Sequence, residues 1–497
     1  MRQGKKCVQQ DRSTRLCDGN LGKINREVET PAYDRNGIST GIVHIGTGAF
    51  HRAHQAVYVD DCLAAGEGDW GIVGASLRSP DTRDALGPQD GLYTLAVQDK
   101  AGERLRVIGS IAKLLVAPED PQALVAYLAD KATRIVTLTV TEKAYLRRGD
   151  GKLDLDHPDI AWDLSNPQRP RTVYGFLSAG LENRFASGLP AFTVLCCDNL
   201  PANGETVRQL FLEYVTARGS QYAEAMADVA FPSTMVDRIV PATTDEDRSR
   251  ISGKIGVTDA WPVKTEPFMQ WVIEDQFPLG RPRWERFGVT MVEDVRPFEE
   301  MKLRLLNGAH SAMAYLGLLV GRASVAEAFN DPDIRTFING LWEEAIPTLP
   351  REAGLEPDKY TAALAERFSN PALVHRTAQI AMDGSQKLPQ RILAAAATRL
   401  RDGAPTGHLL TVVAAWIACC EARGRTLPAG HFADPLDDRL ADLFSGMLSV
   451  SELVAQVFQV AGFTSIDESG EIARRVAVHL DAIRNGGALA AMRMANA

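Results

Sequence analysis

The sequence contains few cysteines, and none has the spacing of a metal site or a disulfide framework. Seven cysteines occur among 497 residues. Two adjacent pairs, Cys196-Cys197 and Cys419-Cys420, lie inside apolar runs, where cysteine usually serves as a small core residue. No Cys/His/Glu ligand set of the kind that zinc enzymes use is apparent. We therefore expect a protein without a bound metal, in the reducing setting of the cytoplasm.

Long hydrophobic runs and an excess of positive charge are also missing. The longest apolar run, Leu409 to Cys420, is too short to span a bilayer and predicts a buried helix. The first thirty or so residues are polar and basic and lack the apolar segment of a secretory signal. The net charge of −9 argues against a general nucleic-acid binder. We expect neither a membrane nor a nucleic acid as a partner.

The residues that are present form an ordinary globular composition, with 45% hydrophobic and 24% charged residues. The length allows two or three domains with a large core. An apolar strand, Gly41 to Ile45, runs into the turn Gly46-Thr47-Gly48, and a helical run follows to Leu63. Glycines at such a turn let the backbone approach a diphosphate. Because His51 stands where the usual fingerprint has a third glycine, an ordinary glycine turn is an open alternative.

A second strand is predicted from Trp70 to Leu77. An acid just past it, Asp81, stands where the ribose 2′-hydroxyl of NAD would be held and where a 2′-phosphate would be repelled. This favours NAD over NADP, although the neighbouring Arg78 opposes that preference. Asp81 could equally be a turn residue after Pro80.

Further strands and helices alternate over about 250 residues, which predicts an elaborated doubly wound α/β domain. The further predicted strands are Leu92 to Val97, Leu105 to Ile108, Arg134 to Val140 and Phe192 to Cys197. Polar clusters follow the last two, and ligands of open parallel sheets bind at the carboxyl ends of strands. Glu142, Lys143 and Asn199 are therefore candidate site residues, although turn formation alone could explain Asp198-Asn199.

The second half of the chain has a different pattern. Residues 230 to 297 are rich in proline and aromatic residues and predict ordered, cleft-lining connections. From Pro297 onward helical periodicity dominates, as in Thr361 to Phe368, His408 to Ala422, Leu436 to Phe444 and Val450 to Val460. We expect a disordered basic extension over residues 1–36, an α/β domain over 37–296 and a mainly α-helical domain over 297–497.

One helix, beginning at Pro297, carries a polar face. Pro297, Glu299 and Glu300 are typical of a helix start. At roughly 100° per residue, Lys302, His310 and Asn307 would lie near about 0°, 80° and 140° on the helical wheel. An amine, an imidazole and an amide on one side could deprotonate a hydroxyl and hold the oxygen left behind. The alternative is an amphipathic helix whose polar side is only solvated.

A cationic segment follows later, with Arg376, Lys387 and Arg391 in a short stretch of sequence. Arginine suits bidentate capture of a carboxylate, so this segment is a candidate anion clamp. A solvated helix end would explain the same charges.

Together these motifs resemble the long-chain polyol dehydrogenases of the mannitol dehydrogenase family, which includes mannitol 2-dehydrogenase and fructuronate (D-mannonate) reductase. The resemblance covers about Gly41 to the C-terminus. The matching runs are Gly46 to Gln55, Thr141-Glu142-Lys143, Asp198-Asn199, Asp237-Arg238, Glu266-Pro267-Phe268, Gln270-Trp271-Val272, and Lys302 with Asn307 and His310. It implies an NAD-binding Rossmann-type domain over residues 37–296 and a helical substrate and catalytic domain over 297–497.

The resemblance also implies roles for individual residues. Lys302 would be the general acid/base, with a pKa lowered by burial and nearby cations. Asn199 and Asn307 would donate amide hydrogens to the reacting oxygen, and His310 would position the substrate or the lysine. The residues implied in NAD binding are Gly46, Thr47, Gly48, Ala49, Phe50, His51, Arg78, Asp81, Glu142 and Lys143.

The segment from Arg376 to Arg391 is similar to that of fructuronate reductases, and Gln379 stands where mannitol dehydrogenases tend to carry an arginine. Lys387 would bind the sugar chain, with Arg376 or Arg391 facing a carboxylate. We therefore expect a metal-independent, NAD-dependent interconversion of D-fructuronate and D-mannonate in hexuronate catabolism. Leu77-Arg78-Ser79 and Asp259 to Pro262 are more similar to mannitol enzymes, so mannitol 2-dehydrogenase is the alternative.

A catalytically idle NAD-binding sensor is a remote alternative, because Lys302, Asn199 and Asn307 are all present. The expected partner is a small sugar acid or polyol. The chain would act as a monomer or a small homo-oligomer.

Overall fold

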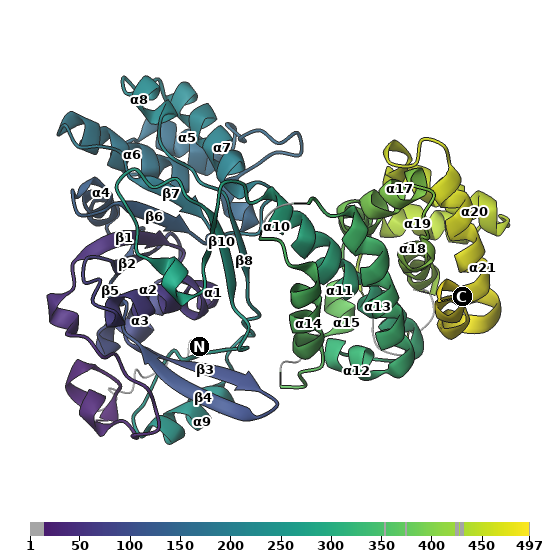
Figure 1. Ribbon diagram of the computed structural model, residues 1–497. Helices are drawn as coiled ribbons and strands as arrows, with labels where there is room; N and C mark the ends of the chain where they lie inside the picture. Colours follow the sequence, from purple (N-terminus) through teal and green to yellow (C-terminus); the bar gives the residue numbers. More distant parts are fainter. Residues whose placement is uncertain (1–13, 352–353, 373–374, 423–426, 428–431, 497) are drawn as a thin grey trace, which may run out of the picture. The chain divides into compact units, whose positions relative to one another are not determined.

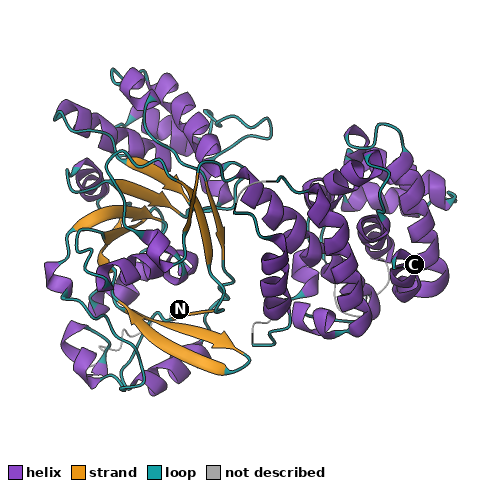
Figure 2. Ribbon diagram, in the orientation of Figure 1, coloured by secondary structure: helices purple, strands orange, loops and turns teal. Residues whose placement is uncertain are grey.

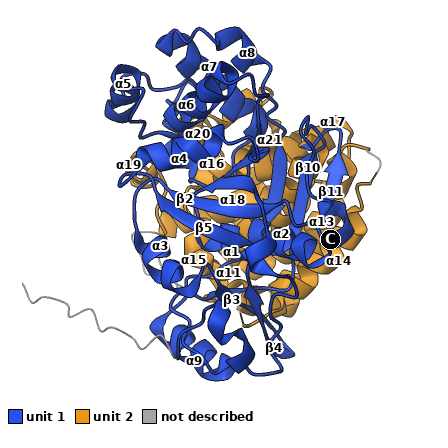
Figure 3. Cartoon of the chain, turned by 90° about the vertical axis from the view of Figure 1, so that its left-hand side faces the viewer, with its two compact units in different colours: residues 1–295 blue, residues 296–497 orange. Residues whose placement is uncertain are grey.

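The computed structural model describes residues 14–351, 354–372, 375–422, 427 and 432–496. The chain divides into two compact units, unit 1 (Met1–Val295) and unit 2 (Arg296–Ala497), which Figure 3 shows in different colours. All strands of the described residues lie in unit 1, whereas the described part of unit 2 is helical (Figure 2). This confirms the predicted fold class of an α/β domain followed by a mainly α-helical one.

A five-stranded parallel sheet forms the centre of unit 1 (Figure 1). In spatial order its strands are β5 (Ile111–Val116), β2 (Gly71–Ser76), β1 (Thr40–Ile45), β6 (Ile135–Leu138) and β7 (Thr193–Cys196). Strand β1 pairs in parallel with β2 on one side and with β6 on the other. The strand order therefore reverses between β1 and β6, where sheets of this kind bind their ligands.

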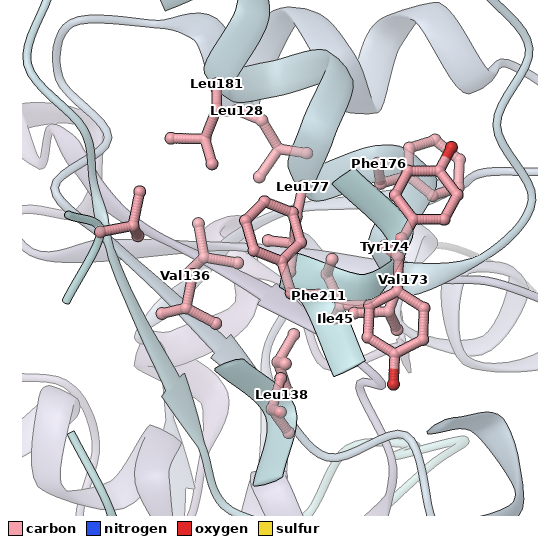
Figure 4. Close-up of a cluster of buried hydrophobic side chains, with 14 of the residues drawn as sticks. Ile45, Leu128, Val136, Leu138, Val173, Tyr174, Phe176, Leu177, Leu181 and Phe211 are labelled. Atoms are coloured by element: carbon pink, nitrogen blue, oxygen red, sulfur yellow. The ribbon is translucent and has the colours of Figure 1, made fainter. Parts of the chain in front are cut away.

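Both faces of this sheet are buried, which is usual for parallel strands. Side chains alternate along β1, so that Val43 and Ile45 join one core cluster and Ile42 joins another. Figure 4 shows the first cluster, in which Leu177 and Phe211 pack over Val136 and Leu138. Helices α4 (Pro121–Ala129), α6 (Val173–Ala186) and α7 (Asn203–Arg218) supply its outer layer, and α2 (Gln55–Ala64) covers the opposite face.

The predicted sheet membership was wrong for two strands. Strands β3 (Tyr93–Asp99) and β4 (Gly102–Ile108) form an antiparallel hairpin that pairs with β9 (Val263–Thr265) in a separate sheet. Only two residues connect β3 to β4, and a connection that short joins antiparallel strands only. The fifth strand of the parallel sheet is β5, which the sequence reading missed.

The proline- and aromatic-rich region also contains a small sheet of its own. Strand β10 (Gln270–Glu274) pairs antiparallel with β8 (Thr234–Asp237) and parallel with β11 (Thr290–Val292). Trp271 and Trp284 are fully buried beneath it. These tryptophans explain why the region is ordered, because each buries a large apolar area.

The structure departs from the predicted disorder over residues 14–36. Leu16 and Ile24 are buried and join a core cluster with Ile251 and Ile255. The amide of Leu16 donates to the carbonyl of Thr258 at 2.9 Å. Apolar burial and backbone pairing hold this part of the extension against unit 1. Residues 1–13 lie outside the described residues.

Unit 2 begins with α10 (Arg296–Met301), which continues into the π-helix η7 (Lys302–Asn307) and α11 (Gly308–Val320). The four helices predicted in the C-terminal half are confirmed. They are α14 (Pro357–Phe368), α18 (Gly407–Glu421), α19 (Asp437–Phe444) and α20 (Val450–Ala461). The remaining helices are α12 (Val325–Asn330), α13 (Pro332–Ala345), α15 (Thr377–Ala381), α16 (Gly384–Leu388), the π-helix η9 (Pro389–Leu393), α17 (Ala394–Arg401) and α21 (Glu471–Ala495).

Helix α18 contains the longest apolar run of the sequence and is buried from His408 to Cys420. It packs against α11, α13 and α21, as expected for a helix that is apolar on every side. Within the part of the chain that the structure describes, no helix combines the length and apolarity needed to cross a membrane.

Candidate active site

Unit 1 contains a cavity of about 840 Å³ at the carboxyl ends of the parallel strands. One part of its wall is the turn after β1, and a second part follows β2. A third part is the loop after β6, so that the cavity lies at the reversal of strand order. Its volume is in the range of small-molecule and cofactor pockets. The predicted residues that line it are Gly46, Thr47, Gly48, Arg78 and Asp81.

The turn after β1 requires glycine at its first position. Gly46 has a φ of +103°, and a Cβ atom added there would lie 2.1 Å from the carbonyl oxygen of Thr139. Any side chain would therefore push the turn away from the loop after β6. The amide of Gly48 turns back to the carbonyl of Gly46 at 2.6 Å. Exposed, side-chain-free backbone of this kind fits the close approach of a diphosphate, as predicted.

The helix predicted after this turn is interrupted. Helix α1 (Ala49–Ala53) ends at His54, which has non-helical backbone angles, and α2 starts directly after it. The carbonyl of Arg52 accepts a hydrogen bond from the hydroxyl of Tyr93, and the carbonyl of Ala53 accepts one from Arg238. Side chains from other elements thus bond the carbonyls at the end of α1, where the helix is interrupted. Ala49 and Phe50 lie on α1 beside the turn and do not line the cavity.

His51 occupies the third fingerprint position and is fully buried. Its ring stacks on the ring of His44 in β1, with centroids 3.4 Å apart and an interplanar angle of 10°. Because the two rings are parallel, they let α1 lie close to β1, as the third glycine of the usual fingerprint does. Burial lowers the pKa of His44 to about 3 and the pKa of His51 well below its ordinary value, so both rings are neutral. His51 therefore holds α1 against β1 directly after the glycine turn.

The residues after β2 line the cavity as predicted. Arg78 and Asp81 are both exposed, and Asp81 is the first residue of α3 (Asp81–Leu86). The preference for NAD over NADP therefore stays a prediction.

Another part of the cavity wall was not predicted from the sequence. The guanidinium of Arg171 stacks on the ring of Trp162 at 3.6 Å, and the indole nitrogen of Trp162 donates to the carbonyl of Arg169 at 3.0 Å. All three residues line the cavity. Arg169, Pro170 and Arg171 form a basic run before α6, but nothing in their spacing points to the strand ends from which they are distant in sequence.

The loop after β6 contributes different residues from those predicted. Glu142 and Lys143 are exposed and do not line the cavity, whereas their neighbours Ala144 and Leu146 do. The assignment of Glu142 and Lys143 to the cofactor therefore has no support from the cavity wall. Asn199 is exposed just beyond the carboxyl end of β7, as its position in the sequence indicated.

In unit 2, Lys302 begins a π-helical turn, where a straight α-helix was predicted. A π-turn bonds residue i to residue i+5 and so brings residues five positions apart onto one side. Lys302 and Asn307 are five apart, whereas α-helical geometry would separate them by about 140°. Lys302 is only 8% exposed, so its amine is held in a largely desolvated setting. π-turns of this kind frequently occur at functional sites.

His310 lies one turn further along, buried to 7% exposure. Its ring lies 4.9 Å from that of Phe368 and meets the ring of His375 edge-on at 5.2 Å. Its Nε2 atom has no hydrogen-bond partner among the described residues. Burial, reinforced by the nearby charges of Arg367 and Arg391, lowers the pKa of His310 well below its ordinary value. His310 is therefore a neutral imidazole whose buried Nε2 atom lacks a hydrogen-bond partner among the described residues.

The cationic segment does not assemble the predicted anion clamp. Lys387 donates to the carbonyl of Met382 at 2.6 Å and pairs with Asp383 at 3.6 Å. Arg391 donates to the hydroxyl of Ser311 at 3.2 Å. Arg376 and Gln379 are exposed at the start of α15. Lys387 thus has a carboxylate partner of its own, whereas Arg391 contacts a neutral hydroxyl, and its charge helps to lower the pKa of Lys387 after the larger effect of burial.

Helices η7 and η9 pack against each other, which brings Arg391 near the polar face of Lys302. Gly308 makes this approach possible, because a Cβ atom there would lie 3.2 Å from the carbonyl oxygen of Arg391. Within the described ranges, no group of three or more His, Cys, Asp or Glu side chains is arranged to hold a metal ion.

Two family models match the chain and together cover most of it. The model described as "Mannitol dehydrogenase Rossmann domain" matches residues 40–286, and "Mannitol dehydrogenase C-terminal domain" matches residues 294–484. The mannitol 2-dehydrogenase of Phaeosphaeria nodorum is 42% identical over 86% of this chain and 76% of its own length. The mannitol 2-dehydrogenase of Aspergillus fumigatus is 42% identical over 86% of this chain and 88% of its own length.

Two solved structures of polyol dehydrogenases are also similar to this chain over nearly its whole length. A Pseudomonas fluorescens mannitol 2-dehydrogenase, in a ternary complex with NAD and D-mannitol, is 38% identical, with a TM-score of 0.80. The alignment covers 97% of this chain and 99% of that one. A D-sorbitol dehydrogenase in substrate-free form is 33% identical, with a TM-score of 0.89, over 96% of this chain and 100% of that one.

These relatives overturn the predicted interconversion of D-fructuronate and D-mannonate. Both fungal relatives and one of the two solved structures are mannitol 2-dehydrogenases, and these similarities do not support the expected closeness to fructuronate reductase. The cationic segment gives no independent evidence for a sugar acid, since Lys387 pairs with Asp383 and Arg391 donates to the hydroxyl of Ser311. The relatives are enzymes, in line with the predicted dehydrogenase and not with an idle sensor.

Proposed function

Because the chain belongs to the mannitol dehydrogenase family, we propose that it is an NAD-dependent mannitol 2-dehydrogenase. In this proposal it oxidises a secondary alcohol of D-mannitol to the 2-ketone, fructose. The observation that carries the proposal is the π-turn Lys302–Asn307, whose i to i+5 spacing favours an amine and an amide on one side, with Lys302 largely buried. An amine and an amide in that arrangement can remove a hydroxyl proton and stabilise the oxygen.

Unit 1 would hold the coenzyme in the cavity at the strand ends. NAD, when bound, supplies a nicotinamide ring that can accept a hydride. Gly46 and Gly48 would let the backbone approach the diphosphate, and Asp81 would accept a hydrogen bond from a ribose hydroxyl. Arg171, fixed by its stack on Trp162, would add positive charge on the facing wall.

Unit 2 would supply the proton chemistry. Lys302 Nζ would take the proton of the reacting hydroxyl as the carbon–hydrogen bond breaks and its electron pair leaves as hydride. The carbon–oxygen double bond forms from the electron pair that the proton leaves behind. Asn307 on the same π-turn, and Asn199 beyond β7, would donate amide hydrogens to that oxygen as negative charge develops.

The groups around Lys302 suit a neutral polyol. His310 is neutral and has a ring nitrogen without a partner among the described residues, so it can bond a hydroxyl without introducing charge. Lys387 and Arg391 would donate to hydroxyls further along the sugar chain. Asp383 already pairs with Lys387, so this amine does not require a carboxylate on the substrate.

The proposal is tested by a screen that follows NAD reduction spectrophotometrically with D-mannitol, D-sorbitol, D-arabinitol and D-mannonate. We expect D-mannitol to give the highest kcat/KM, with D-mannonate more than about tenfold lower. We expect prior incubation with EDTA to leave the rate unchanged, since a lysine supplies the base. Higher kcat/KM for D-mannonate than for D-mannitol would contradict the proposed substrate.

A further inference from the structure

We infer that Asp198 is a positioning residue that fixes one wall of the coenzyme cavity. Its carboxylate ties the loop after β6, residues Thr139 to Leu146, to the end of β7. The inference rests on the proposed function in that the cavity is taken to hold NAD. It concerns how the cavity keeps its shape and assigns Asp198 no direct contact with the substrate.

Three donors from the loop converge on this carboxylate. Asp198 Oδ2 accepts hydrogen bonds from the amide of Val140 at 2.9 Å and from the hydroxyl of Tyr145 at 2.7 Å. Asp198 Oδ1 accepts one from the amide of Thr141 at 3.2 Å. Burial, together with neighbouring Cys196 and Asp198, raises the pKa of Tyr145 well above its ordinary value, so the hydroxyl keeps its proton and donates. An ionised carboxylate is the side chain that can accept all three bonds.

The loop needs such an anchor because its backbone is unusual. Thr141 has a φ of +76° and Leu146 a φ of +48°, although neither is glycine. A β-branched residue rarely adopts positive φ unless the surrounding structure imposes it. Asp198 bonds the amide of Thr141 itself and so acts at the strained position.

The anchored loop is the part of the cavity that faces the glycine turn. Thr139 and Val140 line the cavity, and the hydroxyl of Thr139 donates to the carbonyl of Gly46 at 2.8 Å. A shift of this loop would therefore disturb the position of the turn. Asp198 also directly precedes Asn199, which is proposed to bond the reacting oxygen. The same carboxylate therefore fixes the position of the loop after β6 relative to the residues that follow β7.

Replacing Asp198 with asparagine tests the inference, because asparagine keeps the size but only one acceptor oxygen. Whichever way the amide is turned, its NH₂ group faces one of the two loop amides, donor against donor. Binding of NADH is measured by fluorescence titration, and kcat and KM are measured with D-mannitol. We expect Asp198→Asn to raise the Kd for NADH about tenfold and to lower kcat.

A second substitution distinguishes positioning from general stability. Glycine adopts positive φ without strain, so adding Thr141→Gly to Asp198→Asn should restore at least half of the lost NADH affinity on a logarithmic scale. Tyr145→Phe removes one donor and leaves both backbone bonds, so we expect a smaller but measurable rise in Kd, of about threefold. That milder variant decides the question if Asp198→Asn melts below the assay temperature, in which case an unchanged Kd would overturn the inference.

Asp467→Asn is the matched control. Asp467 is a buried aspartate that accepts the amides of Ile472 and Ala473 at 3.0 and 2.8 Å in unit 2. Its substitution should lower the melting temperature without changing the Kd for NADH. The inference is overturned if Asp198→Asn leaves the Kd unchanged, if both variants raise it equally, or if Thr141→Gly restores nothing. Wild-type protein that binds NADH but does not oxidise D-mannitol would contradict the proposed substrate alone.

Discussion

At the scale of single residues, Lys302 is the group on which the proposed chemistry depends. It is largely buried and shares a π-turn with Asn307. The neutral ring of His310 follows on α11. An amine, an amide and an imidazole on one continuous helix can be held with little freedom, and such rigidity favours proton transfer to a defined oxygen.

Replacing Lys302 with alanine should lower kcat for D-mannitol oxidation by about 10² to 10⁴, the usual contribution of a general base. NADH binding should be nearly unchanged, because the coenzyme cavity belongs to unit 1. Steady-state kinetics and a fluorescence titration measure the two effects separately. The exposed Lys359, which pairs with Glu356 at the start of α14, is the control, and Lys359→Ala should keep full turnover. Equal kcat for Lys302→Ala and wild type would remove Lys302 from the mechanism.

Several residue positions could be predicted from sequence and others could not. Gly46 and Gly48 could be predicted to line the cavity because their position depends on neighbours along the chain, whereas the roles of Lys302 and Asn307 stay predictions. The stack of His51 on His44 and the three bonds to Asp198 join residues distant in sequence. No spacing rule indicates such pairs, and therefore the asparagine of Asp198-Asn199 was singled out while the aspartate was not.

At the scale of elements, hydrophobic periodicity predicted the helices well and their internal irregularities not at all. Helix α18 was recognised from its apolar run, but both π-turns were missed. A π-turn inserts one residue into a helix and leaves the apolar pattern on either side almost intact. The break at His54 has a similar cause, since it depends on side chains of Tyr93 and Arg238 that arrive from other elements.

The start of α18 is held by a buried charge cluster. The carboxylate of Glu344 accepts the amides of His408 and Leu409, both at 3.0 Å, and the ring nitrogen Nδ1 of His408 at 2.9 Å. The other ring nitrogen of His408 bonds Asn496 at 2.8 Å, which ties the end of α21 to the same point. Burial alone would lower the pKa of His408, but the bonds to Glu344 and Asn496 raise it above its ordinary value.

This cluster predicts a pH-dependent stability. A histidine with a raised pKa in the folded state contributes stability that is fully present below its unfolded pKa of about 6.5 and is lost as pH rises through the folded value. His408→Gln should therefore lower the free energy of unfolding by about 2 kcal/mol near pH 6 and by less near pH 9. Urea unfolding at the two pH values measures the difference. A cost that is equal at both, or larger at the higher pH, would show that His408 is not charged in the folded protein.

At the scale of the whole molecule, the sequence indicated the two-part architecture but not all of its sheets. The change from strand signals to helical periodicity near residue 297 agrees with a chain whose described strands all lie in unit 1. The hairpin of β3 and β4 was wrongly assigned to the parallel sheet because strand signals carry no information about the partner strand. Tertiary pairing decides the sheet to which a strand belongs.

The substrate was the least predictable property. The segment around Lys387 suggested a sugar acid from the density of its positive charge. Charge density in sequence does not show which cations already have a carboxylate partner, and in the structure Lys387 pairs with Asp383. The assignment to a sugar acid was corrected by the identity to mannitol 2-dehydrogenases, which extends over most of the chain and not over a single segment.

The central claim is that the chain transfers hydride from a secondary carbon of D-mannitol to NAD. The most direct measurement is a single reaction of wild-type protein with NAD and D-mannitol deuterated at both C2 and C5, which are equivalent by symmetry, analysed by mass spectrometry. We predict equimolar fructose and deuterated NADH, since the hydrogen on carbon leaves with its electron pair while the hydroxyl proton goes to Lys302. Fructose without deuterium in NADH, or no fructose at all, would contradict the account.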